Sequence, residues 1–255
     1  MDVQAYLERI HYTGALLPTR ETLRDLQLAH LLSVPFENLS IHAREPILLQ
    51  EEALFDKIVA RGRGGFCYEL NGLFAMLLRR LGFTVSMLSA GVARDDGGFW
   101  PDFDHMTLMV LLDHRWLVDV GFGNAFRRPL WIDQGEVQAQ GKRSYQIDAD
   151  GGWRILKERE DGKEWKPLYR FTLHPRTLSD YADMCHYHQT SPESPFTQRR
   201  ICSKAKADGR VTLSGMRLIE TEGQERRERV LADEAEYAAV LAQEFGIVNY
   251  RGRCF

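Results

Sequence analysis

The 255-residue sequence predicts an α+β protein in which a helical part, a strand-rich part and a small mixed part follow one another. In residues 1–84, apolar side chains recur at helical spacing. From 85 to 190, short alternating runs are separated by turn signals, and residues 191–255 mix both patterns. We therefore expect a helical block (1–84), a small β-barrel or curled sheet (85–190) and a mixed α/β block (191–255).

The composition narrows the classes of protein to which the chain can belong. Hydrophobic residues make up 44% and charged residues 27% of the sequence, as in ordinary globular proteins, and the net charge of −3 argues against nucleic-acid binding. Residues 1–9 lack the apolar segment of a signal peptide, and every apolar run is far shorter than the about 20 residues that cross a bilayer. We expect a cytoplasmic protein with small-molecule partners and no membrane partner.

The cysteines favour free thiols over a disulfide framework. No two of them have the C-x-x-C spacing, and a reducing cytoplasm keeps thiols reduced. The stretch Cys185-His186-Tyr187-His188 is the one local group of metal-ligand types, and without a second group at a recognised spacing we expect no bound metal. The four cysteines are Cys67, Cys185, Cys202 and Cys254.

The first block contains two predicted helices before residue 60. Leucines recur on one face over residues 21–32, where Thr19 is the expected N-cap and Pro35 stops the helix. The following loop presents Phe36, which either projects into a cavity or packs among the helices. A further helix begins over 54–59 and breaks at a glycine-rich loop.

That glycine-rich loop leads directly into a helix that begins near Cys67. Apolar residues recur at helical spacing from Leu70 to Leu81, and Gly82 is placed to end the helix. The positive end of the helix dipole, with Arg61 and Arg63 nearby, is expected to favour a thiolate. A buried and inert cysteine is the alternative that this stretch alone leaves open.

The second block opens with strands that alternate in hydropathy, and two of them form a predicted hairpin. A turn at Asp113-His114 separates residues 104–112 from residues 115–123. A second turn, 148–152, separates two later strands. The other predicted strands cover residues 83–88, 145–147, 153–156 and 169–173.

The hairpin brings His105 and Asp119 to the same end of the sheet, and its loop length decides whether they meet. A two-residue turn places His105 opposite Phe122 and turns Asp119 to the other face. A three-residue loop at 112–114 pairs His105 with Gly121 and puts it on the face of Asp119. A His–Asp dyad therefore requires an odd loop or a bulge, whereas a solvated His and a turn-forming Asp are the alternatives.

The third block is small and mixed. A short helix is predicted over 178–182, and residues 183–207 are interpreted as loop and helix that link to the end of the chain. Two strands, 211–213 and 216–219, flank a Ser-Gly turn, and a closing helix covers 234–245 before Gly246.

Five segments of this chain resemble motifs of the arylamine N-acetyltransferases. Residues 61–71 resemble the active-site cysteine motif, and Pro35–Leu39 resembles an early loop of the family. Asp104–Met106 and Val118–Gly123 are similar to its His and Asp motifs, in the expected order, and Ser194–Phe196 is similar to a later segment. The resemblance covers essentially the whole chain. The short end after the closing helix is typical of the compact, bacterial-type members.

The resemblance implies a fold, a mechanism and a set of site residues. The fold is a helical bundle, a β-barrel and an α/β lid around a cysteine-protease-like Cys-His-Asp core. Cys67 is the implied nucleophile, His105 its base and Asp119 the orienting carboxylate. Acetyl-CoA donates an acetyl group to Cys67 by ping-pong transfer, and an arylamine, hydrazine or N-hydroxyarylamine accepts it. The implied acceptor pocket consists of Phe36, Val92, Phe122 and Phe196, and the implied donor contacts are Gly121, Gly123 and Asn124.

Three other functions fit parts of the same pattern. Relatives of the family act as amide synthases that close macrolactams from carrier-protein-bound chains. A Cys-His-Asp hydrolase of the peptidase or transglutaminase type would pass the acyl group to water. A metal-binding or non-catalytic scaffold would show no acylation of Cys67.

Overall fold

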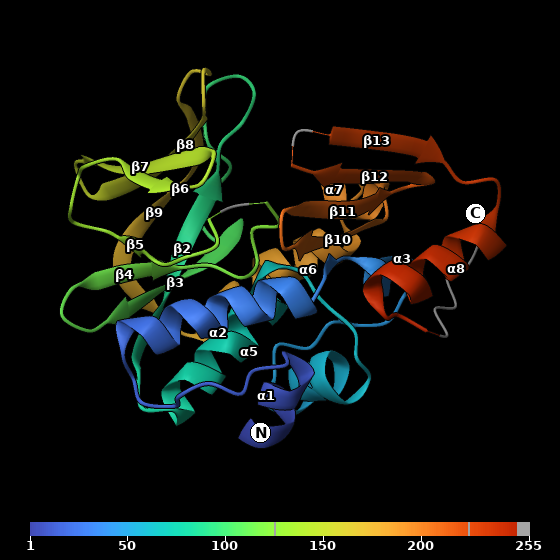
Figure 1. Cartoon of the computed structure of the whole chain (residues 1–255), viewed down its shortest axis with the longest axis horizontal. Coiled ribbons are helices and arrows are strands. Elements are labelled where there is room, and N and C mark those ends of the chain that lie inside the picture. The colour runs from blue at the N-terminus through green and yellow to red at the C-terminus, as the bar shows by residue number, and fades with distance from the viewer. Residues whose placement is uncertain (125, 224, 249–255) are drawn as a thin grey trace.

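The computed structural model describes residues 1–124, 126–223 and 225–248, and the fold is shown in Figure 1. Helix α5 lies at the centre and is buried on nearly every side from Cys67 to Ala75. The other helices of the first block pack around it because their apolar stripes face it. The helices here are α1 (Val3–Arg9), α2 (Arg20–Ser33), α3 (Leu39–Ala43), α4 (Glu51–Phe55), the π-helical turn η1 (Asp56–Ala60) and α5 (Cys67–Arg80).

Helix ends in this block follow the signals in the sequence. The Oγ1 atom of Thr19 accepts a hydrogen bond from the Thr22 backbone N–H at 3.2 Å, so the predicted N-cap of α2 is confirmed. Gly82 has a φ of 89° immediately after α5, which confirms its role in ending that helix.

An eight-stranded antiparallel sheet covers one side of α5 and curls into a barrel-like shape (Figure 1). Strand β3 contacts α5 and carries His105 at its start. The spatial order is β5-β4-β3-β2-β9-β8-β7-β6. The strands are β2 (Thr84–Val92), β3 (His105–Leu111), β4 (Arg115–Val118), β5 (Leu130–Trp131), β6 (Gln138–Gln140), β7 (Arg143–Asp150), β8 (Trp153–Glu160) and β9 (Lys166–Arg176).

The two edge strands of this sheet, β5 and β6, are joined by side chains. Gln138 accepts a hydrogen bond from the Trp131 N–H at 2.8 Å and donates one to the Trp131 carbonyl at 2.9 Å. Gln140 accepts from the backbone N–H groups of Arg127 and Arg128. These glutamine amides satisfy backbone groups that a regular strand partner would otherwise pair.

A second, five-stranded sheet unites the end of the chain with residues from the first block. Its order is β1-β10-β11-β12-β13, and the two-residue β1 pairs Phe36 with Ser203 and Glu37 with Cys202. The strands are β1 (Phe36–Glu37), β10 (Ile201–Lys206), β11 (Gly209–Ser214), β12 (Arg217–Glu222) and β13 (Glu225–Val230). The short helices η2 (Leu178–Tyr181), α6 (Ala182–Thr190) and α7 (Pro195–Gln198) connect the two sheets.

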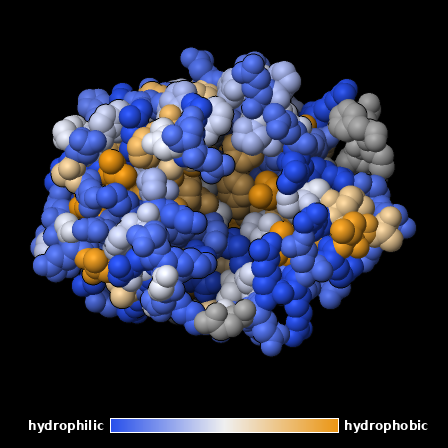
Figure 2. Space-filling model, turned by 90° about the horizontal axis from the view of Figure 1, so that it is seen from above, coloured by the Kyte–Doolittle hydropathy of each residue, from blue (hydrophilic) through white to orange (hydrophobic). Residues whose placement is uncertain are grey.

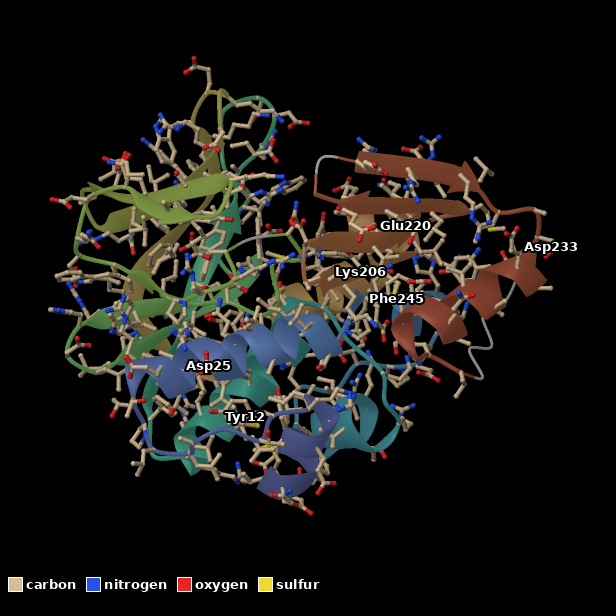
Figure 3. The ribbon with its side chains drawn as sticks, viewed as in Figure 1. Tyr12, Asp25, Lys206, Glu220, Asp233 and Phe245 are labelled. Carbon is tan, nitrogen blue, oxygen red and sulfur yellow. The ribbon has the colours of Figure 1, made fainter. Side chains whose placement is uncertain are left out.

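Helix α8 (Glu234–Phe245) covers one face of the five-stranded sheet, as predicted for the closing helix. Figure 3 labels its N-cap Asp233 and its last residue Phe245. The Nζ atom of Lys206 on β10 lies 3.2 Å from Glu220 of β12 and 3.1 Å from Glu244 of α8 (Figure 3). Tyr237, Leu241 and Phe245 are buried against the sheet, so apolar contact holds the helix in place.

Several sequence predictions differ from the structure, and one is the strand predicted over 115–123, which ends at Val118. Residues 201–206 form β10, so the prediction of loop and helix there is wrong; strand neighbours on both sides decide the conformation of a segment with little apolar alternation. Strand β13 is exposed throughout and was not predicted, because backbone pairing with β12 forms it without an apolar face. The turn predicted over 148–152 is restricted to Gly151 and Gly152, since β7 continues to Asp150.

None of the helices in the described residues has both the length and the apolar character needed to cross a bilayer.

The glutamine bridge between β5 and β6 predicts a measurable loss of stability. Gln138→Ala removes two hydrogen bonds and leaves two Trp131 backbone groups unpaired, so the free energy of unfolding should fall by about 1–3 kcal/mol. The exposed Gln4 of α1 provides the control, since Gln4→Ala should change stability by about 0.5 kcal/mol or less. Urea unfolding of both variants tests this, and equal stabilities would contradict the role given to the bridge.

Candidate active site

The β3–β4 hairpin has the three-residue loop that a His–Asp dyad requires. Leu111 pairs with Arg115 and Val110 with Trp116, so residues 112–114 form the loop. The Leu112 N–H donates to the His114 carbonyl at 3.0 Å and closes it. The odd loop therefore puts His105 and Asp119 on one face of the sheet, as the register argument predicted.

His105 and Asp119 are in direct contact. The Nε2 atom of His105 lies 2.7 Å from Oδ2 of Asp119, and the two residues are 3% and 2% exposed. A hydrogen bond to a carboxylate at this distance fixes the imidazole ring and makes Nε2 the protonated nitrogen. The Nδ1 atom is thereby left as the nitrogen that can exchange a proton with another group.

The Asp119 carboxylate accepts four hydrogen bonds, two on each oxygen. Oδ1 accepts from Asn71 Nδ2 and from the Gly121 N–H, each at 2.9 Å. Oδ2 accepts from His105 and from the Tyr169 hydroxyl, the latter at 3.1 Å. Burial alone raises the pKa of Asp119, but the charge of His105 and the hydrogen bonds outweigh it, so the pKa lies below the ordinary Asp value.

Asn71 and Tyr169 are site residues that the sequence analysis did not identify. Asn71 Nδ2 also donates to the Met106 carbonyl at 2.7 Å, and Asn71 Oδ1 accepts from the Val120 N–H at 2.9 Å. It thus connects α5 to β3 and to the segment after β4. The sequence signal for Asn71 was its place as a polar residue one helical turn after Cys67, within an apolar helix. Tyr169 had no such signal beyond its place in a predicted strand.

Cys67 is the first residue of α5 and is buried, with 3% of its surface exposed. Phe66 is the N-cap, and its N–H donates to the Glu69 carboxylate at 3.1 Å, which fixes the start of the helix. The segment after Asp119 packs directly on the cysteine: a Cβ atom at Gly121 would lie 2.7 Å from the Cys67 Cα and 2.8 Å from Asn71 Nδ2. Gly121 therefore permits the close approach of these two segments.

The expectation that Arg61 and Arg63 stabilise a Cys67 thiolate is wrong, because both guanidinium groups pair with carboxylates. Arg63 pairs with the buried Glu37 at 2.9 Å, and the half-exposed Arg61 pairs with Asp56 at 2.9 Å. Burial raises the pKa of Cys67 well above its usual value, and the charges of Asp104 and Asp119 raise it further, while a hydrogen bond with the Met106 backbone lowers it in part.

Aromatic rings surround the His–Asp pair and the start of α5. The ring of Phe122 lies 5.1 Å from that of His105, edge to face. Phe196 lies 5.8 Å from Phe66 and 6.1 Å from Phe36, measured between ring centroids. Each of these distances is typical of aromatic packing. The fourth predicted acceptor residue, Val92, is half-buried at the end of β2.

The three residues expected near the donor have different surroundings. Gly121 is buried against Cys67, whereas a Cβ at Gly123, which has a φ of 75°, would meet no atom within 4 Å. Asn124 is exposed, and its side-chain oxygen accepts a hydrogen bond from Arg143 Nη1 at 3.1 Å.

Cys185 and His188 of α6 have separate side-chain partners. Cys185 Sγ lies 3.3 Å from Gln189 Nε2, and His188 Nδ1 lies 3.0 Å from the Ser194 hydroxyl. Within the described ranges, no group of three or more His, Cys, Asp or Glu residues is arranged to hold a metal ion. Cys67, Cys185 and Cys202 are free thiols, and Cys254 lies outside the described residues.

The structure thus combines a buried cysteine at a helix N-terminus with a hydrogen-bonded His–Asp pair whose following segment packs on that cysteine, and these are the residue types of thiol-dependent acyl transfer. The family described as N-acetyltransferase matches residues 19–251. The chain belongs to the arylamine N-acetyltransferase family and is an acyltransferase.

Relatives and solved structures support this membership over most of the chain. An arylamine N-acetyltransferase of Mycolicibacterium smegmatis is 39% identical in an alignment of 225 residues that covers 86% of this chain and 82% of the relative. Proansamycin X synthase of Amycolatopsis mediterranei is 32% identical over 95% of this chain and 96% of its own length. The structure of Mycobacterium marinum arylamine N-acetyltransferase in complex with CoA matches with a TM-score of 0.89 and 35% identity, and covers 96% of this chain and 93% of that one.

The contact between Gly121 and Cys67 predicts that a single methyl group damages the site. Gly121→Ala places a Cβ atom where only 2.7 Å separates it from backbone, so it should lower the free energy of unfolding by about 1–3 kcal/mol. By displacing Asp119 from Cys67 it should also reduce the acylation rate by about 100-fold.

Gly152→Ala is the matched control, because its Cβ would meet no atom within 4 Å and its φ is not in the left-handed region. Thermal unfolding and transfer assays on both variants compare the two effects. A Gly121→Ala enzyme with wild-type stability and activity would refute the close-packing argument.

Proposed function

We propose that this protein transfers an acetyl group from acetyl-CoA to an aromatic amine through a thioester on Cys67. The observation that carries the proposal is the buried His105–Asp119 contact beside the segment that packs on Cys67. A base held by a carboxylate and placed beside a cysteine is what a thiol needs to become a nucleophile at neutral pH.

In the first half-reaction, His105 takes the Cys67 proton at Nδ1, and the sulfur attacks the thioester carbonyl of acetyl-CoA. The bond between the carbonyl carbon and the CoA sulfur then breaks, and His105 returns its proton to the leaving thiolate. In the second half, the amine attacks the Cys67 thioester, His105 accepts the amine proton, and the cysteine sulfur leaves. His105 keeps its Nε2 proton throughout, and Asp119 accepts the hydrogen bond from it and stabilises the imidazolium.

The acceptor side of the site is aromatic, which suits a flat aryl group. Phe122 lies against His105, and Phe36 and Phe196 lie near the start of α5 through Phe66. We assign these rings and Val92 to the acceptor side, which would receive arylamines, hydrazines and, for O-acetylation, N-hydroxyarylamines. Several relatives, among them the one from Mycolicibacterium smegmatis, are named arylamine N-acetyltransferases, which supports this substrate class.

We assign the donor to the side of the loop that follows Asp119. Gly121, Gly123 and Asn124 lead from the cysteine toward the surface, and Gly123, whose φ of 75° favours glycine, adds no side chain to this path. The CoA complex of the Mycobacterium marinum relative supports a CoA thioester as the co-substrate. The mechanism uses the chain's own residues and CoA and includes no metal.

We further propose that the three predicted blocks, 1–84, 85–190 and 191–255, act as helical bundle, barrel and lid. The residues assigned to the site support this division, because they come from all three. Cys67 belongs to the first block, His105 and Asp119 to the second, and Phe196 to the third.

One relative favours a second candidate function. Proansamycin X synthase shares 32% identity with this chain over nearly its whole length, so an amide synthase that uses the same three residues is the alternative. Such an enzyme would take an acyl chain bound to a carrier protein and would not be acylated by free acetyl-CoA.

Intact-mass spectrometry after brief mixing with acetyl-CoA tests the proposed mechanism. The wild type should gain one acetyl group that an added arylamine removes, and Cys67→Ala should gain none. His105→Gln should slow acylation by about 10²–10⁴-fold, because it removes the base. His174→Gln, at an exposed position on β9, is the control and should acylate normally.

Two outcomes would contradict the proposal. An acetyl group that appears without dependence on Cys67 would exclude the thioester. Release of free acetate at the same rate with and without amine would indicate a hydrolase.

A further inference from the structure

The side of the site that we assign to the acceptor consists of apolar side chains. The rings of Phe122 and Phe196 lie 5.1 Å from His105 and 5.0 Å from His188, respectively, between centroids. On the face shown in Figure 2, hydrophobic residues gather at the floor of a hollow with a hydrophilic rim. Apolar walls bind an aryl ring but offer no hydrogen-bond acceptor to its amine. One amine proton passes to His105 in the proposed second half-reaction, so the N–H group that the product keeps needs another partner.

Asp104 brings a carboxylate to this side of the site. It directly precedes His105, and its Oδ2 atom accepts a hydrogen bond from the backbone N–H of Val92 at 3.4 Å. The hydroxyl of Tyr68, the residue after Cys67, donates to the Asp104 carbonyl at 3.2 Å. The backbone at Asp104 is therefore tied to the first turn of α5, and its side chain lies against a residue of the assigned acceptor side.

The Asp104 carboxylate uses little of its hydrogen-bonding capacity. In the described part of the chain its two side-chain contacts are the Val92 N–H and the Nε2 atom of His188, each at 3.4 Å. The Asp119 carboxylate, by contrast, accepts four hydrogen bonds between 2.7 and 3.1 Å. An ionised carboxylate has about four acceptor positions, so Asp104 can still accept from a ligand. With 11% of its side chain exposed, it is within reach of a small molecule.

His188 has an unused nitrogen that faces the same carboxylate. The residue is 2% exposed, and its buried Nε2 makes no hydrogen bond with any described residue, although Asp104 Oδ1 lies 3.4 Å away. The other nitrogen, Nδ1, lies 3.0 Å from the Ser194 hydroxyl. Ser194 Oγ accepts from the Phe196 N–H at 3.3 Å, so its own hydrogen can go to Nδ1 and Nε2 can carry the ring hydrogen toward Asp104. Two nearly buried polar groups without close partners indicate a place for a ligand.

The position of Asp104 opposes the thiolate form of Cys67. Burial raises the pKa of Cys67 most, and among the nearby carboxylates Asp104 contributes more to this rise than Asp119. A negative charge that is short of donors and close to the nucleophile favours neither the fold nor the first half-reaction. The second half-reaction, in which an amine brings N–H donors, is the step that such a carboxylate can assist.

We propose that Asp104, held by His188, binds an N–H group of the acceptor and thereby selects primary amines and hydrazines. The inference rests on the proposed function, which makes the amine the second substrate. As the carbon–nitrogen bond forms and the carbon–sulfur bond breaks, one amine proton passes through His105 to the Cys67 sulfur. The other hydrogen stays on nitrogen, where Asp104 accepts a charge-assisted hydrogen bond from it. A secondary amine has a single N–H hydrogen and therefore none for Asp104.

The test separates loading of the acetyl group from its removal, with p-chloroaniline and its N-methyl derivative as acceptors. Intact-mass spectrometry follows acetylation of Cys67 by acetyl-CoA alone, and then the loss of the acetyl group after either amine is added. Asp104→Asn keeps the size of the side chain and removes its charge. It should slow removal by p-chloroaniline about ten-fold or more, leave removal by the N-methyl amine unchanged, and not slow acetylation. Asp95→Asn makes the same charge change at an exposed position between β2 and β3 and should behave as the wild type.

Calorimetry with p-chloroaniline and the unacylated enzyme separates this inference from the proposed function, because it measures amine binding without acyl transfer. If acetyl-CoA did not acylate Cys67, the proposed function would fail, whereas binding that Asp104→Asn weakens and Asp95→Asn does not would still support the amine site. Slower acetylation, or equal slowing with both amines, would overturn the inference, since it would indicate a general disturbance. Unchanged removal by p-chloroaniline would overturn it as well, and so would unchanged binding in an enzyme that transfers no acetyl group.

Discussion

A carboxylate that is buried in a protein loses its hydration, which costs several kcal/mol of free energy. This cost is offset only if hydrogen-bond donors of the protein replace the lost water. Asp119 meets this condition with four donors that come from α5, β3, β9 and the segment after β4. The same hydrogen bonds that stabilise the carboxylate therefore connect the central helix to the curled sheet. Because His105 is one of the donors, its ring orientation is determined by this requirement.

The start of α5 is held by a second set of buried charges. Lys57 pairs with Glu69 at 2.8 Å, and Arg63 pairs with Glu37, which lies on β1. These pairs fix the glycine-rich loop and the N-cap that precede Cys67. A buried ion pair fixes geometry more reliably than it adds net stability, and here it fixes the position of the first turn of α5, where Cys67 lies.

Much of this arrangement was predictable from local patterns, and the remainder depends on distant partners. Thr19, Gly82 and the helix over 234–245 followed from capping and periodicity, which act within one segment. The register of the hairpin depends on whether its loop has an odd or an even number of residues. The sequence therefore predicted that His105 and Asp119 share a face only if the loop is odd, and the three-residue loop confirms this. The role of Asn71 escaped prediction because its partners lie more than 30 residues away, and strand β10 because it shows little apolar alternation and depends on pairing with both the distant β1 and the adjacent β11.

The central claim is that His105 and Asp119 are what make a buried Cys67 reactive, since Arg61 and Arg63 have other partners and burial opposes the thiolate. The most direct test is the rate of Cys67 alkylation by iodoacetamide as a function of pH, with the modified residue identified by peptide mass mapping. The account predicts that the wild type reacts well below the ordinary thiol pKa of about 8.5, and that His105→Gln reacts only above it. A wild type with the pH profile of an ordinary or buried thiol, unchanged by His105→Gln, would contradict it.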